Sequence, residues 1–218
     1  RSTMEFIIFL TLAYLIGSIP TAVLVSKHFF GIDIREHGSG NAGATNSFRI
    51  MGKKAGIFVM VIDMLKGVIA VNLAHLTSLD WDLQRELIVN LQIGLGMCAI
   101  LGHVFPIWAG FRGGKGVATL FGMILGIHPQ VALFLVIVFM VMLLLTKYVS
   151  LSSITASLAF PLLLFFFFTE QEVLYKIFAI ATACLVVLTH HKNINRLIQG
   201  NESQVRLRKN KPGNNDEE

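Results

Sequence analysis

The feature that most constrains this chain is a succession of long apolar runs separated by short polar segments. A helix that crosses the hydrocarbon core of a bilayer needs about 20 apolar residues, within a range of about 17–25. Over its 218 residues the chain is 54% hydrophobic and only 14% charged, whereas a typical soluble domain is about 25% charged. The pattern therefore predicts an all-α fold, a polytopic membrane helix bundle with no soluble domain.

Seven segments fit this interpretation, one of them short. At about 1.5 Å per residue, the short run 117–127 spans only about 16 Å and must be a half-depth or shielded segment. Residues 1–202 are expected to form one transmembrane domain, and the polar residues 203–218 a disordered cytoplasmic tail. The predicted transmembrane segments are 4–26, 55–76, 87–107, 117–127, 130–146, 150–168 and 172–188.

The positions of the basic residues predict the orientation. Most of the 18 Lys and Arg residues fall in alternate connections and in the region from Lys192 onward. Because cytoplasmic loops carry an excess of Lys and Arg, we expect the amino terminus outside and the carboxyl terminus in the cytoplasm. The net charge of +5 is mostly this signal, and it also attracts anionic membrane lipids. Nucleic-acid binding is disfavoured, because no soluble basic domain is available for it.

The first polar segment that could carry chemistry is GSGNAGATN at 38–46, followed by Arg49. Glycine allows backbone N–H groups to approach a ligand closely, and successive amides form an anion-binding nest. Phosphate binding is the favoured interpretation, and a flexible turn between helices is the alternative. The embedded G-x-G-x-x-G pattern follows an apolar helix and not a strand, so a dinucleotide site is rejected. The nearby His28 and Asp33 match an H-x₄-D acyltransferase spacing, which we interpret as a chance match for so short a pattern.

The second segment is GFRGGKGVAT at 110–119, in which a helix is predicted to begin directly after Lys115. A helix amino terminus and a lysine together form an anion site. The segment is not a Walker A loop, because Ala109 and Gly116 stand where that pattern needs Gly and Ser or Thr. His103, just upstream, is either a site residue or a capping or packing histidine.

The third segment is THHKNINRL at 189–197. His190, Asn193 and Arg196 follow at three-residue spacing, so on a helix they share one face, and Arg binds phosphate in bidentate fashion. The alternative is an ordinary amphipathic interfacial helix. A metal site at the two histidines is weaker, because no carboxylate or thiolate set accompanies them.

Asp63 and Lys66 lie inside an apolar run, where ionisable residues are normally paired or functional. They can neutralise each other at i and i+3, or Lys66 can serve the site. The predicted topology places all three polar segments on the cytoplasmic face. We therefore expect Arg49, Lys115 and Arg196 to meet in a pocket for a phosphate head with an apolar tail behind it.

Four ordered motifs resemble a known family. GSGNAGATN at 38–46, DMLKG at 63–67, GHVFPIWAGFRGGKGVAT at 102–119 and THHKNINRL at 189–197 resemble the bacterial acyl-phosphate:glycerol-3-phosphate acyltransferases, the PlsY family. The resemblance implies transfer of a fatty acyl group from acyl phosphate to the 1-hydroxyl of glycerol 3-phosphate, giving lysophosphatidic acid and inorganic phosphate. It implies no metal or other cofactor, and a soluble enzyme that makes acyl phosphate is an expected partner.

The resemblance also implies roles for individual residues. No role is carried to His191 and Lys192, where the family often has Arg and Glu. The implied catalytic residues are Ser39, Asn46, Lys115, His190 and Asn193. The implied substrate-binding residues are Gly38, Gly40, Asn41, Gly43, Thr45, Arg49, Lys66, His103, Gly114, Gly116, Thr119 and Arg196.

Two questions stay open at this level. The first is the base: the motifs contain no Ser-His-Asp arrangement, which favours a phosphate oxygen of the substrate over His103 or His190. The second is transport, which would need polar residues in the outer halves of the helices. Those halves are nearly uniformly apolar, with a few exceptions, and a phosphotransferase would need an Asp-rich metal motif that is not present. The exceptions are Asn72, His75, Asn90 and Gln92.

Overall fold

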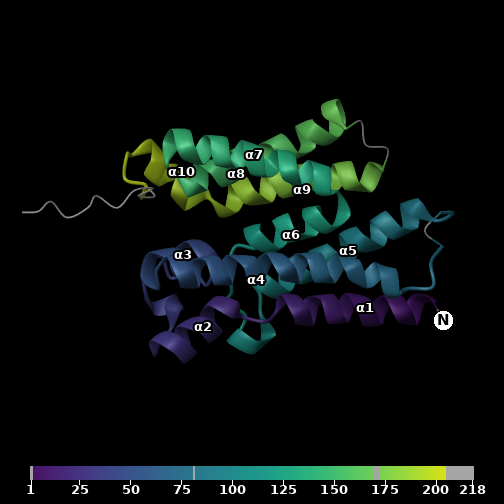
Figure 1. Cartoon of the computed structure of the whole chain (residues 1–218), viewed down its shortest axis with the longest axis horizontal. Helices are drawn as coiled ribbons and strands as arrows, with labels where there is room; N and C mark the ends of the chain where they lie inside the picture. The colour runs from purple at the N-terminus through teal and green to yellow at the C-terminus, as the bar shows by residue number, and fades with distance from the viewer. Residues whose placement is uncertain (1, 81, 169–171, 205–218) are drawn as a thin grey trace, which may run out of the picture.

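The computed structural model describes residues 2–80, 82–168 and 172–204, and these residues form an elongated bundle of helices without a strand (Figure 1). The all-helical fold class is therefore confirmed. Three short 3₁₀ turns, η1 (Ile34–Glu36), η2 (Leu73–Leu76) and η3 (Ile107–Ala109), and a π turn, η4 (Leu163–Phe167), supplement the α-helices. The α-helices are α1 (Ser2–Gly17), α2 (Thr21–Phe30), α3 (Ala44–Ile50), α4 (Lys53–Asn72), α5 (Arg85–Val104), α6 (Val117–Ile127), α7 (Pro129–Thr146), α8 (Val149–Leu162), α9 (Val173–Thr189) and α10 (His191–Ile198).

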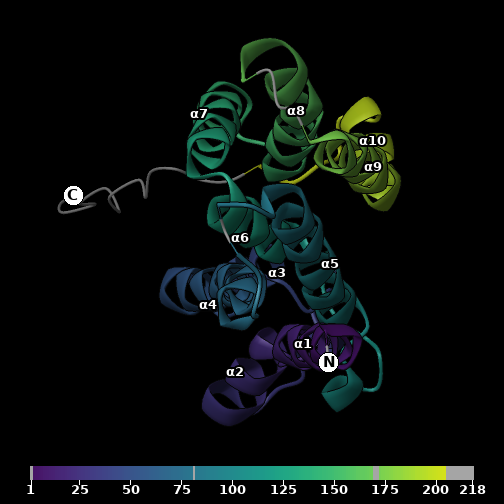
Figure 2. The same ribbon diagram turned by 90° about the vertical axis from the view of Figure 1, so that its right-hand side faces the viewer.

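Two groups of helices lie on either side of α6 (Figure 2). Helices α1, α2, α4 and α5 form one group, and α7, α8 and α9 form the other, while α6 packs against α4 and α5 on one side and α7 on the other. The backbones of α4 and α6 touch, since a Cβ at Gly122 would lie 1.8 Å from the carbonyl oxygen of Met64. Gly122 therefore serves close helix packing within the chain.

Length and composition identify fewer membrane-spanning helices among the described residues than the seven predicted. Among the described residues, five helices are long and apolar enough to span a membrane, and a sixth results if α9 and α10, which are bent by 58°, form one span. Helix α6 has 11 residues, with the predicted bounds, and is too short to qualify. The count of seven is therefore not confirmed, although the short segment is.

The first apolar run is not one straight helix. It breaks between α1 and α2 around Pro20, which has no N–H to donate and cannot continue the hydrogen-bond ladder of α1. Helix α2 ends at Gly31, which adopts a left-handed conformation with φ of 65°. The break places α2 and α3 at the same end of the bundle as α10 (Figure 1).

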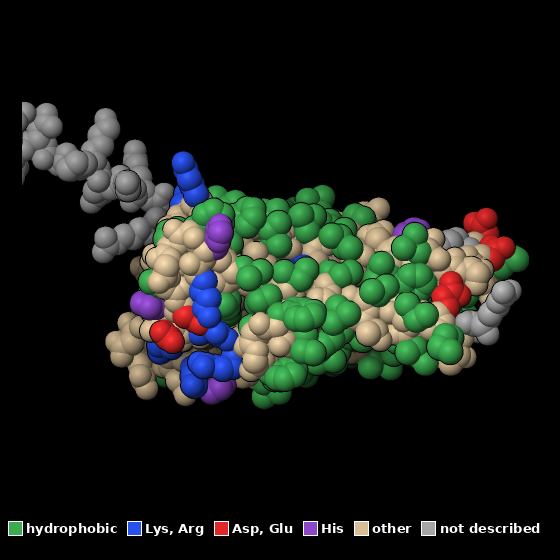
Figure 3. All heavy atoms as spheres, turned by 90° about the horizontal axis from the view of Figure 1, so that it is seen from below, with side chains coloured by type: hydrophobic (Ala, Val, Ile, Leu, Met, Phe, Trp, Pro, Cys, Tyr) green, Lys and Arg blue, Asp and Glu red, His purple; other side chains and the backbone are tan. Residues whose placement is uncertain are grey.

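Charge is distributed unevenly along the long axis. On the face seen in Figure 3, Lys and Arg side chains gather at the end that holds α2 and α3, and hydrophobic side chains cover much of the middle. The amino terminus and the α4–α5 connection lie at the opposite end (Figure 1). An apolar belt with one basic end is the surface expected of a protein that crosses a bilayer.

Candidate functional site

Residues 38–46, a loop together with the first turn of α3 and called the first glycine loop below, are organised by the side chain of Asn46. This residue is 1% exposed. Its Oδ1 accepts a hydrogen bond from the backbone N–H of Ser39 at 3.0 Å. Its Nδ2 donates to the carbonyl oxygens of Ile34 at 3.2 Å, His37 at 2.9 Å and Asn41 at 3.1 Å. Because both polar atoms of the side chain make hydrogen bonds, Asn46 holds the loop in its conformation.

The other predicted residues of the first glycine loop lie closer to the surface. The side chains of Ser39 and Thr45 are exposed, and Gly38 and Gly40 have positive φ values. Gly43 precedes the first residue of α3 and adopts an extended conformation. The loop thus presents hydroxyl groups and backbone amides at the basic end of the bundle.

The loop formed by residues 110–116, called the second glycine loop, contacts both the first glycine loop and α10. A Cβ at Gly114 would lie 3.2 Å from the carbonyl oxygen of Ala42, so the two loops touch. On the other side, Nζ of Lys115 donates to Oδ1 of Asn193 at 2.8 Å. Gly116, at the start of α6, packs against α5. The structure therefore brings together the three polar segments that the sequence singled out.

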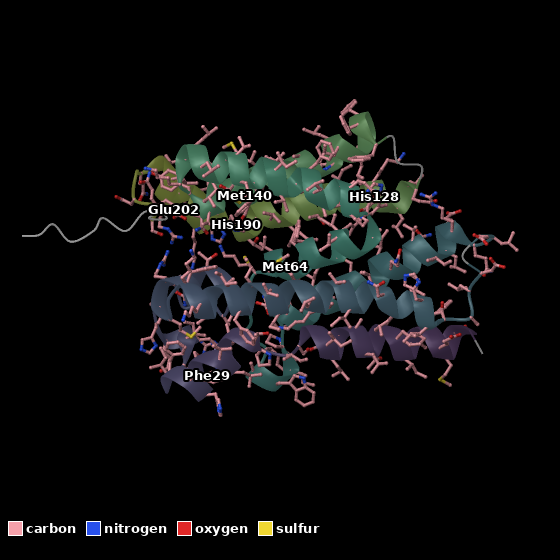
Figure 4. All side chains as sticks on the ribbon, viewed as in Figure 1. Phe29, Met64, His128, Met140, His190 and Glu202 are labelled. Carbon is pink, nitrogen blue, oxygen red and sulfur yellow. The ribbon has the colours of Figure 1, made fainter. Side chains whose placement is uncertain are left out.

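A carboxylate that the site prediction did not include, Glu202, lies at the basic end (Figure 4). Its side chain is 6% exposed, and Oε1 accepts hydrogen bonds from Nδ2 of Asn193 at 2.8 Å and Oγ of Ser150 at 2.7 Å. Its Oε2 accepts from Nε of Arg196 at 2.7 Å. The signal in the sequence was a single acidic residue just after the third motif. Ser150 has a weaker signal, as one of several serines at the start of α8.

Burial and neighbouring charges change how these groups titrate. Burial, together with the positive charge of Arg196, lowers the pKa of Lys115 below the ordinary value of a lysine, and the Glu202 carboxylate only partly opposes this. Burial alone would raise the pKa of Glu202, but the hydrogen bonds from Arg196, Asn193 and Ser150 outweigh it and lower that pKa. At neutral pH the site therefore combines an ionised carboxylate with two cations.

Two further predicted residues lie at the same end. Arg49 donates to Oγ of Ser203 at 2.6 Å, which fixes the segment after α10 against α3. The ring of His190 is buried, and its Nδ1 lies 2.7 Å from the carbonyl oxygen of Val186. Because a carbonyl oxygen only accepts, Nδ1 carries a hydrogen, and Nε2 is left as the acceptor of the neutral ring. Figure 4 shows His190 and Glu202 at this end of the bundle.

Three predicted substrate-binding residues lie deeper in the bundle. Nζ of Lys66 donates to Oδ1 of Asp63 at 2.7 Å and to the carbonyl oxygen of Ile19, and its side chain is 4% exposed. His103 is buried behind the second glycine loop, and Thr119 is buried between α6 and α4. The pairing of Lys66 with Asp63 is the alternative that the sequence left open, and a direct role of these three residues in binding remains a prediction.

Two alternative chemistries gain no geometric support. Asp33 accepts from Arg35 at 2.6 Å and lies 3.2 Å from Nζ of Lys27, and the hydrogen bond from Arg35 holds the pKa of Asp33 well below its usual range. His28 instead packs edge-on against Phe29. Among the residues that the structure describes, no group of three or more His, Cys, Asp or Glu side chains could hold a metal ion.

An apolar cavity extends from the site into the bundle. It has a volume of about 70 Å³ and lies between α5, α6 and α9. Lys115 and Thr189 line its polar end, and the remaining wall is mostly apolar, including Leu120, Phe178 and Leu185. A cation at one end and hydrocarbon along the rest suits a molecule with an anionic head and an apolar chain.

The helices and the distribution of charge define a multi-pass integral membrane protein with a polar site at one end. The sequence model of the glycerol-3-phosphate acyltransferase family matches residues 7–200. The chain belongs to the glycerol-3-phosphate acyltransferase family.

Individual relatives agree with this assignment. A glycerol-3-phosphate acyltransferase of Macrococcus caseolyticus is 41% identical over 206 residues, which cover 94% of this chain and 100% of the relative. One from Fusobacterium nucleatum is 41% identical over 204 residues, with the same coverage of 94% and 100%. Among solved structures, the glycerol 3-phosphate form of PlsY, an integral membrane glycerol 3-phosphate acyltransferase, superposes with a TM-score of 0.81 at 38% identity, covering 92% of this chain and 96% of that one.

Proposed function

We propose that this protein transfers a fatty acyl group from acyl phosphate to the 1-hydroxyl of glycerol 3-phosphate, releasing lysophosphatidic acid and inorganic phosphate. The observation that carries the proposal is the hydrogen bond of Lys115 to Asn193 at 2.8 Å, made while the preceding glycine lies against the first glycine loop. Three segments far apart in the sequence thereby form one anion-binding surface beside an apolar cavity. The solved relatives described as glycerol 3-phosphate and lysophosphatidic acid forms support the same substrate and product.

The proposed chemistry suits this set of groups. An acyl phosphate is a mixed anhydride, so the protein needs mainly to position the reactants and stabilise developing charge. The 1-hydroxyl oxygen attacks the acyl carbon, the bond from that carbon to the phosphate oxygen breaks, and phosphate leaves with the electron pair. In this scheme Ser39, Arg49, Lys115, His190 and Asn193 hold glycerol 3-phosphate, and the amides of the first glycine loop bind the acyl-phosphate head.

The hydroxyl proton is proposed to pass to a phosphate oxygen of the substrate. His103 is buried behind the second glycine loop, and Asp63 is engaged with Lys66, so neither offers a free base at the surface of the site. The hydrogen bonding of His190 leaves its Nε2 as an acceptor near Lys115, and this nitrogen serves to orient the hydroxyl.

The placement in the membrane follows from the same surface. We propose that the basic end faces the cytoplasm of a bacterial inner membrane and the amino terminus lies outside. The cytoplasmic face then receives glycerol 3-phosphate and acyl phosphate made by a soluble enzyme, and the cavity beside α6 accepts part of the acyl chain. Residues 1–202 act as a single transmembrane domain.

The test is release of inorganic phosphate from palmitoyl phosphate by the purified protein, with and without glycerol 3-phosphate. We expect release to depend on glycerol 3-phosphate and to match formation of lysophosphatidic acid mole for mole. In liposomes, labelled glycerol 3-phosphate should be converted without entering the lumen. Flux of label without product would indicate a transporter and overturn the proposal.

A further inference from the structure

A buried polar cluster lies directly behind the second glycine loop. Lys66 donates to Oδ1 of Asp63 and to the carbonyl oxygen of Ile19, at the break between α1 and α2. Nδ1 of His103 lies 3.7 Å from the same Oδ1. Asp63 is 1% exposed and His103 7%. Buried charge is a poor source of stability in itself, so the question is what this cluster holds in place.

The imidazole of His103 touches the second glycine loop as well as the cluster. The carbonyl oxygen of His103 accepts from the N–H of Gly114 at 3.2 Å, and that of Val104 accepts from the N–H of Gly113 at 3.1 Å. A Cβ at Gly114 would lie 2.2 Å from Nε2 of His103, and a Cβ at Gly113 would lie 1.9 Å from the His103 carbonyl oxygen. The loop therefore rests on this histidine with no room for a side chain between them.

Lys115 is the residue that immediately follows this contact. Its ammonium group meets Asn193 at 2.8 Å, and a shift of Gly114 away from the imidazole would carry Lys115 with it. The ring itself is buried and faces the loop backbone. His103 can therefore affect the reaction through the loop without contacting substrate.

We propose that Asp63, Lys66 and His103 are positioning residues, which hold the second glycine loop so that Lys115 meets the transferring groups. The proposal rests on the proposed function above. Asp63 lies against the imidazole, Lys66 neutralises Asp63 and ties the cluster to the break after α1, and the imidazole supports the loop. His103 thereby has a role distinct from that of a general base.

The first experiment replaces the ring nitrogens. His103→Phe keeps a planar ring and removes the attraction to Asp63, so we expect kcat to fall at least tenfold. His103→Asn keeps a polar atom near Nδ1 and should recover part of that loss. A general base would lose activity equally in both variants, and that result would overturn the proposal. Thermal unfolding in detergent verifies that each variant is folded.

A double-mutant cycle separates positioning from loss of stability. In a Lys115→Ala background there is no ammonium to misplace, so adding His103→Phe should lower kcat less than twofold further. Leu95→Ala is the control, because Leu95 is buried on the same helix in a different part of the core. Leu95→Ala should lower kcat by the same factor in the wild-type and Lys115→Ala backgrounds. If His103→Phe lowers kcat in the Lys115→Ala background by the same factor as in wild type, the proposal is overturned.

Gly114→Ala tests the contact from the loop side and does not depend on His103→Phe being folded. We expect at least a tenfold loss of kcat, because the new Cβ collides with the imidazole. In a His103→Ala background the same change should cost less than threefold, since the space is vacant. Equal losses would overturn the proposal. If wild-type protein shows no phosphate release dependent on glycerol 3-phosphate, the proposed function has failed instead.

Discussion

Two lysines, each followed by glycine and each predicted as a site residue, have opposite environments. Lys66 lies inside α4 with its charge neutralised by Asp63 at 2.7 Å and its side chain 4% exposed. Lys115 lies in the second glycine loop and meets the neutral amide of Asn193 at 2.8 Å. The nearby carboxylate, Glu202, is bound by Arg196, Asn193 and Ser150.

The comparison shows how a protein keeps a cation available. A carboxylate partner orients a lysine but also neutralises it, whereas an amide oxygen orients it and leaves the charge uncompensated. The sequence marks both lysines as candidate site residues, and the structure shows that their partners differ in charge. The following experiments test whether the first serves structure and the second serves the reaction.

The largest expected effect is on stability, at Lys66. Lys66→Met leaves the carboxylate of Asp63 buried without a counter-charge, which should destabilise the protein by about 3–5 kcal/mol. The measurement is thermal or denaturant unfolding in detergent micelles. The double variant Asp63→Asn with Lys66→Met removes both charges and should recover much of the loss. An unchanged unfolding midpoint in Lys66→Met would contradict the assignment.

The next effect is on activity, at Lys115. Lys115→Met should lower kcat by about 10²–10³-fold, the usual loss on removing one preorganised donor to developing charge, and change stability by less than about 1 kcal/mol. Lys176→Met is a matched control, because it removes a lysine that lies outside the three polar segments. Lys176 lies on α9, and its Nζ is 5.5 Å from the ring centroid of Phe165. This variant should keep full activity. Comparable losses in the two variants would mean that Lys115 has no special role.

A smaller effect is expected at Glu202. Glu202→Gln keeps the size of the side chain but removes the charge that Arg196 faces, so stability should fall by about 1–3 kcal/mol. Because the pKa of Glu202 is lowered in the folded protein, its stabilising contribution is present above the unfolded pKa and lost as pH falls through the folded one. Unfolding measured against pH should show this acid loss in wild type and not in the variant. Glu86→Gln, an exposed residue at the start of α5, should retain the wild-type profile.

The smallest expected effect is on the pH dependence of kcat, through the ammonium group of Lys115. The lowered pKa of Lys115 means that its ammonium loses a proton at a lower pH than a free lysine, whose pKa is about 10.4. Since the reaction needs the charged form, kcat should decline on the alkaline side before that value. Lys115→Arg stays protonated above pH 12, so the residual activity should lose this alkaline decline. A decline at the same pH in both proteins would assign it to another group.

Features set by local pattern were accessible from the sequence. The bounds of α6 follow from glycine before it and His128-Pro129 after it, and the structure has the same bounds. The meeting of the two glycine loops with α10 follows from the alternation of basic connections, which requires all of them at one end. Both inferences depend only on composition and order along the chain.

Features set by the path of the chain in space were not accessible. Glu202 reaches the site because the chain turns at Gly200, with φ of 70°, and no spacing rule relates that turn to Ser150. The inward orientation of Asn46 depends on three carbonyl groups that converge on it. The sequence indicated that these residues were polar, but not which of them would make hydrogen bonds to other parts of the protein.

The short length of α6 has one further consequence. With 11 residues, it covers about 16 Å, roughly half the thickness of a bilayer core. Lys115 lies two residues before the first residue of this short helix. In the proposed reaction, the water-soluble reactant meets a membrane-embedded one beside this short helix, and the newly made lipid can diffuse sideways into the leaflet without exposing its chain to water.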